Sequence, residues 1–116
     1  MSLMDKPPRG LKTPKPKPDP WYLAEVRRLP CCICLAYGEQ QLSATTAHHP
    51  ICDRHSLERV PDREAIPLCD GHHQGTFDTS KIAIHKERAE WVVKYGSDRE
   101  YIAQTQDMIL GKEIGQ

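Results

Sequence analysis

The amino-acid sequence predicts a small α+β domain that is stapled by zinc, with helices flanking two short strands and a disordered arm in front of them. Its 116 residues allow one small domain. Only 38% of them are hydrophobic, and so thin a core usually needs a disulfide, a metal ion or a partner. Two residue pairs with the spacing of metal ligands, Cys31/Cys34 and Cys69/His72, can supply the staple. We assign residues 1–18 to the arm and residues 19–116 to the single domain.

The N-terminal arm is rich in proline and in positive charge. The stretch "MDKPPRGLKTPKPKPDP" holds six prolines in seventeen residues and almost nothing to bury, which predicts an extended, mostly disordered segment. Residues 1–20 carry a net charge of +3 and residues 21–116 a net charge of −3. This asymmetry fits contact with a polyanion, and it fits a solubilising tail equally well.

The first helix is expected directly after the arm. Asp19 followed by Pro20 is typical of an N-cap and the first helical position, and Pro30 ends the helix "WYLAEVRRL". Its candidates for the core are Trp21, Leu23, Val26 and Leu29. The following stretch "CCICLAYGEQQ" reads as a tight metal-binding turn.

Two strands are expected next. The pair Thr45-Thr46 in "LSATTAHHPI" favours a strand that Pro50 ends. "CDRHSLERVPDRE" is loop-like, and "AIPLC" is a short apolar run typical of a second strand, which leads into "DGHHQ".

Two helices complete the fold. Helical periodicity runs from about Ala83 to Tyr95, and Gly96 is a natural stop. Ser97 and Glu100 have the spacing of a capping box, which begins a last helix from about Asp98 to Leu110.

Metal binding explains the cysteines better than disulfides do. Their number is odd, and the sequence shows neither an export signal nor a membrane span, so we expect a cytoplasmic protein in a reducing compartment. Cys31, Cys34, Cys69 and His72 form the predicted zinc clamp; the alternative is that the cysteines are ordinary small core residues. Cys32 should point away from its neighbours. Cys52 and His55 form a competing half-site, which we interpret as a free thiol and a surface histidine.

Four further histidines remain: His48, His49, His73 and His85. Each one alone could be an ordinary core or surface residue, but together they are many for so short a chain. Adjacent residues on a strand point to opposite sides, so His48 and His49 should face different surroundings. His73 should project from the other side of a helix than His72, and His85 should open the helix that follows.

These motifs resemble the HNH nuclease superfamily with its ββα-metal (His-Me finger) motif. The segments "LPCCIC", "AHHP", "AIPLCDGHHQG", "IAIH" and "VVKYGS" are similar to the RecA-dependent recombination-enhancement nucleases of phages and their prophage relatives. The likeness covers residues 29–97. It implies a metal-dependent endonuclease that hydrolyses DNA and leaves a 5′-phosphate and a 3′-hydroxyl.

The resemblance also implies roles for individual residues. His49 would be the general base, and His48, His73 and His85 would bind the catalytic divalent ion. Asp62 matches an aspartate of the recombination-enhancement group and would orient His49, whereas Glu64 lies near the place of the family's central Asn. The structural cofactor would be Zn²⁺ and the catalytic one Mg²⁺ or Mn²⁺, although imidazole ligands favour Mn²⁺ or Zn²⁺ over Mg²⁺, and Zn²⁺ can occupy the site after purification.

The expected partner is single- or double-stranded DNA, with a RecA filament as a second one and no membrane. Candidate phosphate contacts are Lys12, Lys15, Lys17, Arg54, Arg59 and Arg63. Nothing resembles a base-reading element, so we expect weak sequence preference. The rival interpretation is a zinc-stapled DNA-binding or recombination-adaptor module that does not cut. The sequence leaves the oligomeric state open.

Overall fold

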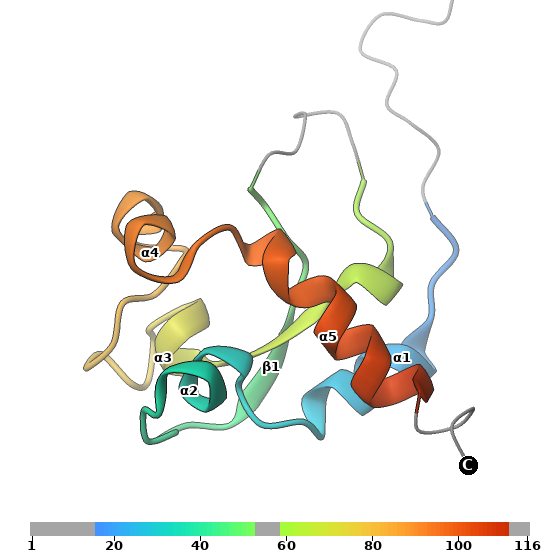
Figure 1. The fold of residues 1–116 in the computed structure, drawn as a ribbon, viewed down its shortest axis with the longest axis horizontal. Coiled ribbons are helices and arrows are strands. Elements are labelled where there is room, and N and C mark those ends of the chain that lie inside the picture. The colour runs from blue at the N-terminus through green and yellow to red at the C-terminus, as the bar shows by residue number, and fades with distance from the viewer. Residues whose placement is uncertain (1–15, 53–58, 112–116) are drawn as a thin grey trace, which may run out of the picture.

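The computed structural model describes residues 16–52 and 59–111, which form helices around a two-stranded sheet (Figure 1). This confirms the predicted α+β class. The elements follow the order α1, α2, β1, η2, β2, α3, α4, η3, α5 and η4. Most of the predicted arm, with Lys12 and Lys15, lies outside the described residues, and so do Arg54 and His55. Within the described part of the chain, every helix is too short or too polar to cross a membrane.

The sheet pairs β1 (Thr45–His48) with β2 (Ile66–Cys69) in antiparallel orientation, and both predicted strands are confirmed. The register places Thr46 opposite Leu68 and His48 opposite Ile66. Since alternate side chains of a strand point to opposite faces, Thr46 and His48 share one face of β1. The loop that leads into β2 contains a 3-10 turn, η2 (Asp62–Glu64).

Helix α1 (Pro20–Arg27) begins as the sequence predicts, because the Asp19 side chain accepts a hydrogen bond from the Tyr22 N–H. The prediction that Trp21 packs in the core is wrong, since its side chain is 43% exposed. The predicted Val26 is fully buried, and Leu23 and Leu29 pack against the same cluster, but Tyr22 takes the buried place expected for Trp21. The buried face of α1 therefore agrees with the prediction except at its first turn.

The expected metal-binding turn contains a short helix, α2 (Cys32–Tyr37). Cys31 is its N-cap residue, so Cys31 and Cys34 lie at the same end of the helix. Gly38 ends α2 with a φ of 66°, a left-handed conformation that glycine adopts without strain. This reversal brings Glu39 back toward the cysteines.

The helix expected from Ala83 begins only at Arg88, so that prediction is wrong for residues 83–87. The amides of Ile84 and His85 donate to the carbonyls of His72 and His73, at 3.0 and 3.1 Å. Those bonds hold the segment beside α3 (Asp70–His73) as a turn, and α4 runs from Arg88 to Tyr95. His85 therefore lies in this turn and does not open a helix.

The C-terminal segment is helical from residue 98 to residue 111, as predicted, but its pitch changes. It consists of a 3-10 turn η3 (Asp98–Tyr101), helix α5 (Ile102–Gln106) and a wider turn η4 (Asp107–Gly111). The predicted capping box of Ser97 and Glu100 is confirmed.

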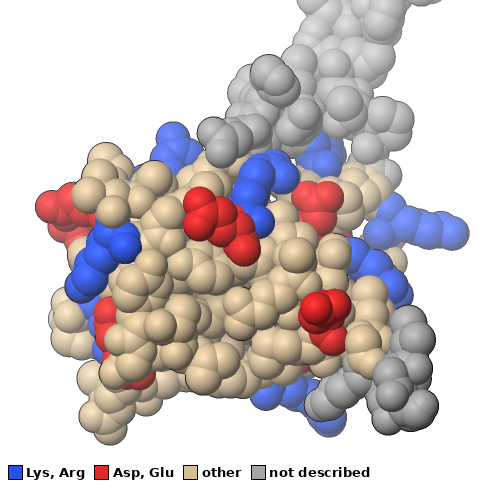
Figure 2. All heavy atoms as spheres, in the orientation of Figure 1, with Lys and Arg blue, Asp and Glu red and all other residues tan. Residues whose placement is uncertain are grey.

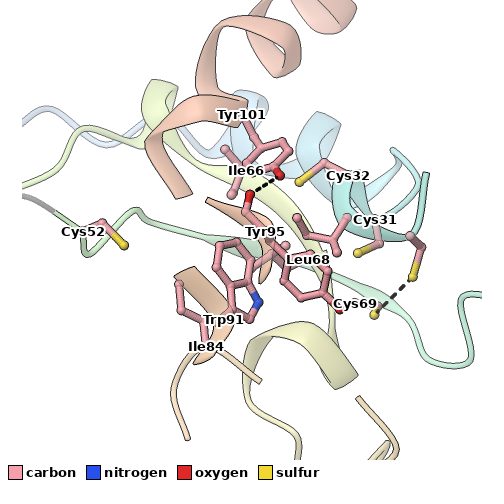
Figure 3. Close-up of a cluster of buried hydrophobic side chains, with 12 residues drawn as sticks. Cys31, Cys32, Cys52, Ile66, Leu68, Cys69, Ile84, Trp91, Tyr95 and Tyr101 are labelled. Atoms are coloured by element: carbon pink, nitrogen blue, oxygen red, sulfur yellow. Dashed lines mark hydrogen bonds between the residues drawn. The ribbon is translucent and has the colours of Figure 1, made fainter. Parts of the chain in front are cut away.

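The main core joins the sheet to α2 and α4 (Figure 3). Ile66 and Leu68 of β2 pack in one buried cluster with Trp91 and Tyr95 of α4. The same cluster includes Cys31, Cys34 and Cys69. The predicted zinc ligands are therefore part of the core itself, so a metal ion held by them would tie α2, β2 and α3 together.

Candidate metal centres and active site

Four buried side chains converge where α2, the end of β2 and α3 meet: Cys31, Cys34, Cys69 and His72. Cys31 and Cys34 come from the first turn of α2, while Cys69 ends β2 and His72 lies in α3. The structure thus brings the four predicted clamp residues together. Cys32 does not belong to this group and is buried in the hydrophobic cluster.

The distances in this Cys3His cluster fit a tetrahedral zinc site. The Nδ1 atom of His72 lies 3.5, 3.7 and 3.4 Å from the sulfurs of Cys31, Cys34 and Cys69. The sulfurs of Cys34 and Cys69 are 3.9 Å apart. Bonds of about 2.3 Å to sulfur and about 2.0–2.1 Å to nitrogen imply about 3.8 Å between two sulfurs and about 3.6 Å between sulfur and nitrogen. The cluster is therefore compatible with structural zinc.

The remaining nitrogen of His72 has a partner that the sequence did not suggest. His72 Nε2 lies 3.0 Å from the Oε1 atom of Glu39, and the Tyr95 hydroxyl donates to Oε2 of the same carboxylate at 2.9 Å. Glu39 therefore holds the ring with Nδ1 toward the sulfurs. Such a carboxylate partner orients a zinc-binding histidine and makes it more basic.

We expect the variant Glu39→Gln to bind zinc ~10–100-fold more weakly, because an amide offers only one acceptor oxygen to His72 and Tyr95 and removes the negative charge. Competition with a chromogenic chelator measures this affinity. The exposed Glu90 of α4 provides the matched control: Glu90→Gln should bind zinc as the wild type does. Equal affinities of the two variants would show that Glu39 does not orient His72.

A second cluster consists of His48, His73 and His85, whose ligand atoms all lie within 4.8 Å of one another. His48 ends β1, His73 ends α3, and His85 lies in the turn beside α3. The ring centroids of His48 and His73 are 4.9 Å apart, and those of His73 and His85 also 4.9 Å. Three imidazoles are a donor set that suits Zn²⁺, Mn²⁺, Co²⁺ or Ni²⁺.

The surroundings of His73 and His85 favour their neutral forms, although the side chain of His85 is exposed at the surface. Burial is the main reason why the pKa of His73 falls to about 4, and the neighbouring His48 and His85 lower it further. The pKa of His85 is lowered by burial first and then by His48. Neutral imidazoles can bind a metal ion, so at neutral pH both rings have the protonation state that a metal centre requires.

His49 lies apart from the three-histidine cluster and pairs with a carboxylate. Its Nε2 atom is 2.8 Å from Oδ1 of Asp62, and its side chain is 37% exposed. The Asp19 N–H donates to the other oxygen of Asp62 at 2.8 Å. This bond and the one from His49 lower the pKa of Asp62, so the carboxylate is an acceptor for His49 Nε2–H. His49 Nδ1 is then the nitrogen that can accept a proton.

The predicted phosphate contacts differ in their surroundings. Lys17 and Arg59 are exposed. Arg63 donates from Nε to Asp19 at 2.6 Å, and its guanidinium lies 5.4 Å from the ring centre of Tyr22. Arg63 therefore has a structural role at the start of α1. Glu64, which spacing put near the place of the family's Asn, lies 3.6 Å from Arg99 and pairs with that side chain.

Two further side chains contact the three-histidine cluster, and neither was expected from the sequence. Asp98 Oδ2 lies 2.8 Å from His48 Nε2, and Thr46 Oγ1 lies 2.7 Å from His73 Nδ1. Asp98 looked like an ordinary first-turn acid of the last helix, and Thr46 an ordinary strand residue. Only the fold brings Asp98 next to His48, because fifty residues separate them. Asp98 also binds the amide of Cys52, whose thiol is buried.

Comparison with known proteins places the chain in a family. No curated protein and no solved structure matches it. One family model, described as a protein of unknown function (DUF968), matches residues 2–112. Because this match spans nearly the whole sequence, the chain belongs to the DUF968 family.

Proposed function

We propose that this protein is a metal-dependent endonuclease of the HNH type that hydrolyses phosphodiester bonds in DNA. The observation that carries the proposal is the pairing of two different histidine sites at the end of β1. His48 belongs to a cluster of three imidazoles, and the next residue, His49, is backed by a carboxylate. A metal site beside a potential general base is the arrangement that metal-assisted hydrolysis requires.

Different residues would act as general base, as the group that orients the base, and as metal ligands. His49 Nε2 donates to Asp62, so His49 Nδ1 can take a proton from an attacking water molecule. Asp62, itself held by the Asp19 N–H, would keep the ring in this orientation. His48, His73 and His85 would hold the divalent ion, which when bound would polarise the phosphoryl group and stabilise the leaving oxygen.

The Cys3His cluster would give the site its rigidity. His72 and His73 are neighbours on α3, and each belongs to a different cluster. Zinc at Cys31, Cys34, Cys69 and His72 would fix α3, and this would fix His73 relative to His48. The doubled histidine is therefore the junction between a structural and a catalytic centre.

DNA would be held mainly through its phosphates. On the face seen in Figure 2, acidic and basic side chains are scattered among uncharged ones, and its coloured residues form no continuous basic surface. Because His49 would be the general base, we expect the DNA to contact the surface around it. Lys17 and Arg59 are candidate phosphate ligands, and Lys12, Lys15 and Arg54 are further candidates outside the described residues. A RecA filament would deliver the substrate if free DNA is cut slowly.

The test is cleavage of supercoiled plasmid and of single-stranded circular DNA by the purified, zinc-containing protein. We expect Mn²⁺ or Mg²⁺ to start nicking, a chelator to stop it, and excess Zn²⁺ to inhibit it. A folded protein that binds DNA but stays inert with every divalent ion, with and without a RecA filament, would overturn the proposal in favour of a DNA-binding module.

A further inference from the structure

The hydrogen bonds of the three-histidine cluster determine which nitrogen of His48 carries a proton. Asp98 is fully buried, and its Oδ2 atom accepts from the Ile51 N–H at 2.7 Å and contacts His48 Nε2 at 2.8 Å. Its other oxygen accepts from the Cys52 N–H at 3.2 Å. Backbone amides can only donate, so both carboxylate oxygens act as acceptors. An ionised carboxylate has no proton to donate, so His48 carries its proton on Nε2, which leaves its Nδ1 lone pair for a metal ion.

A similar count applies to His73, with the opposite result. The Thr46 hydroxyl has one proton, which it donates to the carbonyl oxygen of Leu68 at 2.7 Å. The contact of 2.7 Å between Thr46 Oγ1 and His73 Nδ1 must then be donated by His73. His73 carries its proton on Nδ1, and its Nε2 lone pair is free.

We propose that Asp98 and Thr46 are positioning residues of the second metal centre, which make His48 present Nδ1 and His73 present Nε2 to the ion. This inference rests on the metal site of the proposed function. A histidine whose second nitrogen is unpaired divides its population between two tautomers and two ring orientations, which weakens metal binding. The two positioning residues come from different elements: Thr46 lies in β1, whereas Asp98 begins the C-terminal helical segment. The C-terminal segment is thereby part of the metal site, although it supplies no ligand.

Two matched variants separate the role of the Thr46 hydroxyl from its volume. Thr46→Val keeps the shape and removes the hydroxyl, whereas Thr46→Ser keeps the hydroxyl. Asp98→Asn keeps the volume of Asp98, but its single acceptor oxygen faces three donors: His48 Nε2–H, Ile51 N–H and Cys52 N–H. Zinc content and circular dichroism report whether each variant keeps its structural zinc and its fold.

The first measurement is the nitrogen-15 NMR spectrum of the histidine rings in full-length protein that holds zinc only in the Cys3His cluster. We expect His48 to be protonated on Nε2 and His73 on Nδ1 in the wild type and in Thr46→Ser, which keeps the hydroxyl. Thr46→Val should give a mixture of tautomers at His73. Finding His73 protonated on Nε2 in the wild type would overturn the proposal.

The second measurement is the affinity of the same protein for Co²⁺, followed by its visible absorption. Thr46→Val and Asp98→Asn should bind Co²⁺ ~10–100-fold more weakly, and Thr46→Ser should stay close to the wild type. If Asp98→Asn loses its structural zinc, the two Thr46 variants decide the question. Unchanged affinity in Thr46→Val, or a wild type that binds no Co²⁺ beside its zinc, would refute the positioning role. Weakened binding in a protein that never cuts DNA would refute the nuclease proposal alone.

Discussion

The variant His49→Ala should cut DNA ~10²–10⁴-fold more slowly than the wild type, because general-base catalysis contributes about that factor. His49 is 37% exposed and lies outside both clusters, so its removal should leave the fold and both metal sites intact. Single-turnover nicking of plasmid DNA at saturating Mn²⁺ measures the chemical step. Added imidazole should restore part of the rate, because the truncated side chain leaves space beside Asp62.

The neighbouring Asp62 supplies the control for this result. Asp62→Asn keeps an oxygen that can accept from His49, so its rate should fall between those of the wild type and His49→Ala. Cleavage by His49→Ala at the wild-type rate would show that His49 is not the base. Loss of bound metal from His49→Ala would show instead that this histidine is a ligand.

Replacement of His72 should have the largest effect on stability. A structural zinc site contributes about 10–16 kcal/mol of binding free energy, whereas whole domains are stable by about 5–15 kcal/mol. His72→Ala should therefore leave the chain largely unfolded, with its zinc lost. Far-ultraviolet circular dichroism and metal analysis by mass spectrometry test this.

His73→Ala is the matched variant, because it removes an imidazole from the next position of the same helix. It should stay folded and keep one zinc per chain, but lose the second ion and the cleavage activity. A folded His72→Ala protein with unchanged zinc content would contradict the assignment of the structural site. Unfolding of both variants to the same extent would contradict the division of labour between the two histidines.

The sequence predicts local features of this fold well, because their causes are local. The cap at Asp19, the capping box at Ser97 and the stop at Gly96 depend on residues within one helical turn, and all three appear in the structure. The Cys-x-x-Cys and Cys-x-x-His spacings likewise fix each pair of clamp residues within one short segment.

Contacts between segments that are far apart in the chain could not be predicted from the sequence. Residues 83–87 have a helical pattern, but amide bonds from Ile84 and His85 to α3 outweigh that preference and make a turn. The same limit applies to Glu39 and Asp98, which meet their histidines only in the folded chain. The sequence pattern also could not decide which of two neighbouring aromatic residues of α1 is buried: it is Tyr22, whereas Trp21 is exposed.

The most direct test of the nuclease proposal measures DNA nicking and Mn²⁺ binding together, on the same zinc-containing protein. The account predicts that the nicking rate of the wild type rises with Mn²⁺ and saturates as a single site fills. It further predicts that both the site and the activity disappear in folded His73→Ala. Nicking by His73→Ala at the wild-type rate, or a wild type that fills the site and leaves DNA intact, would contradict it.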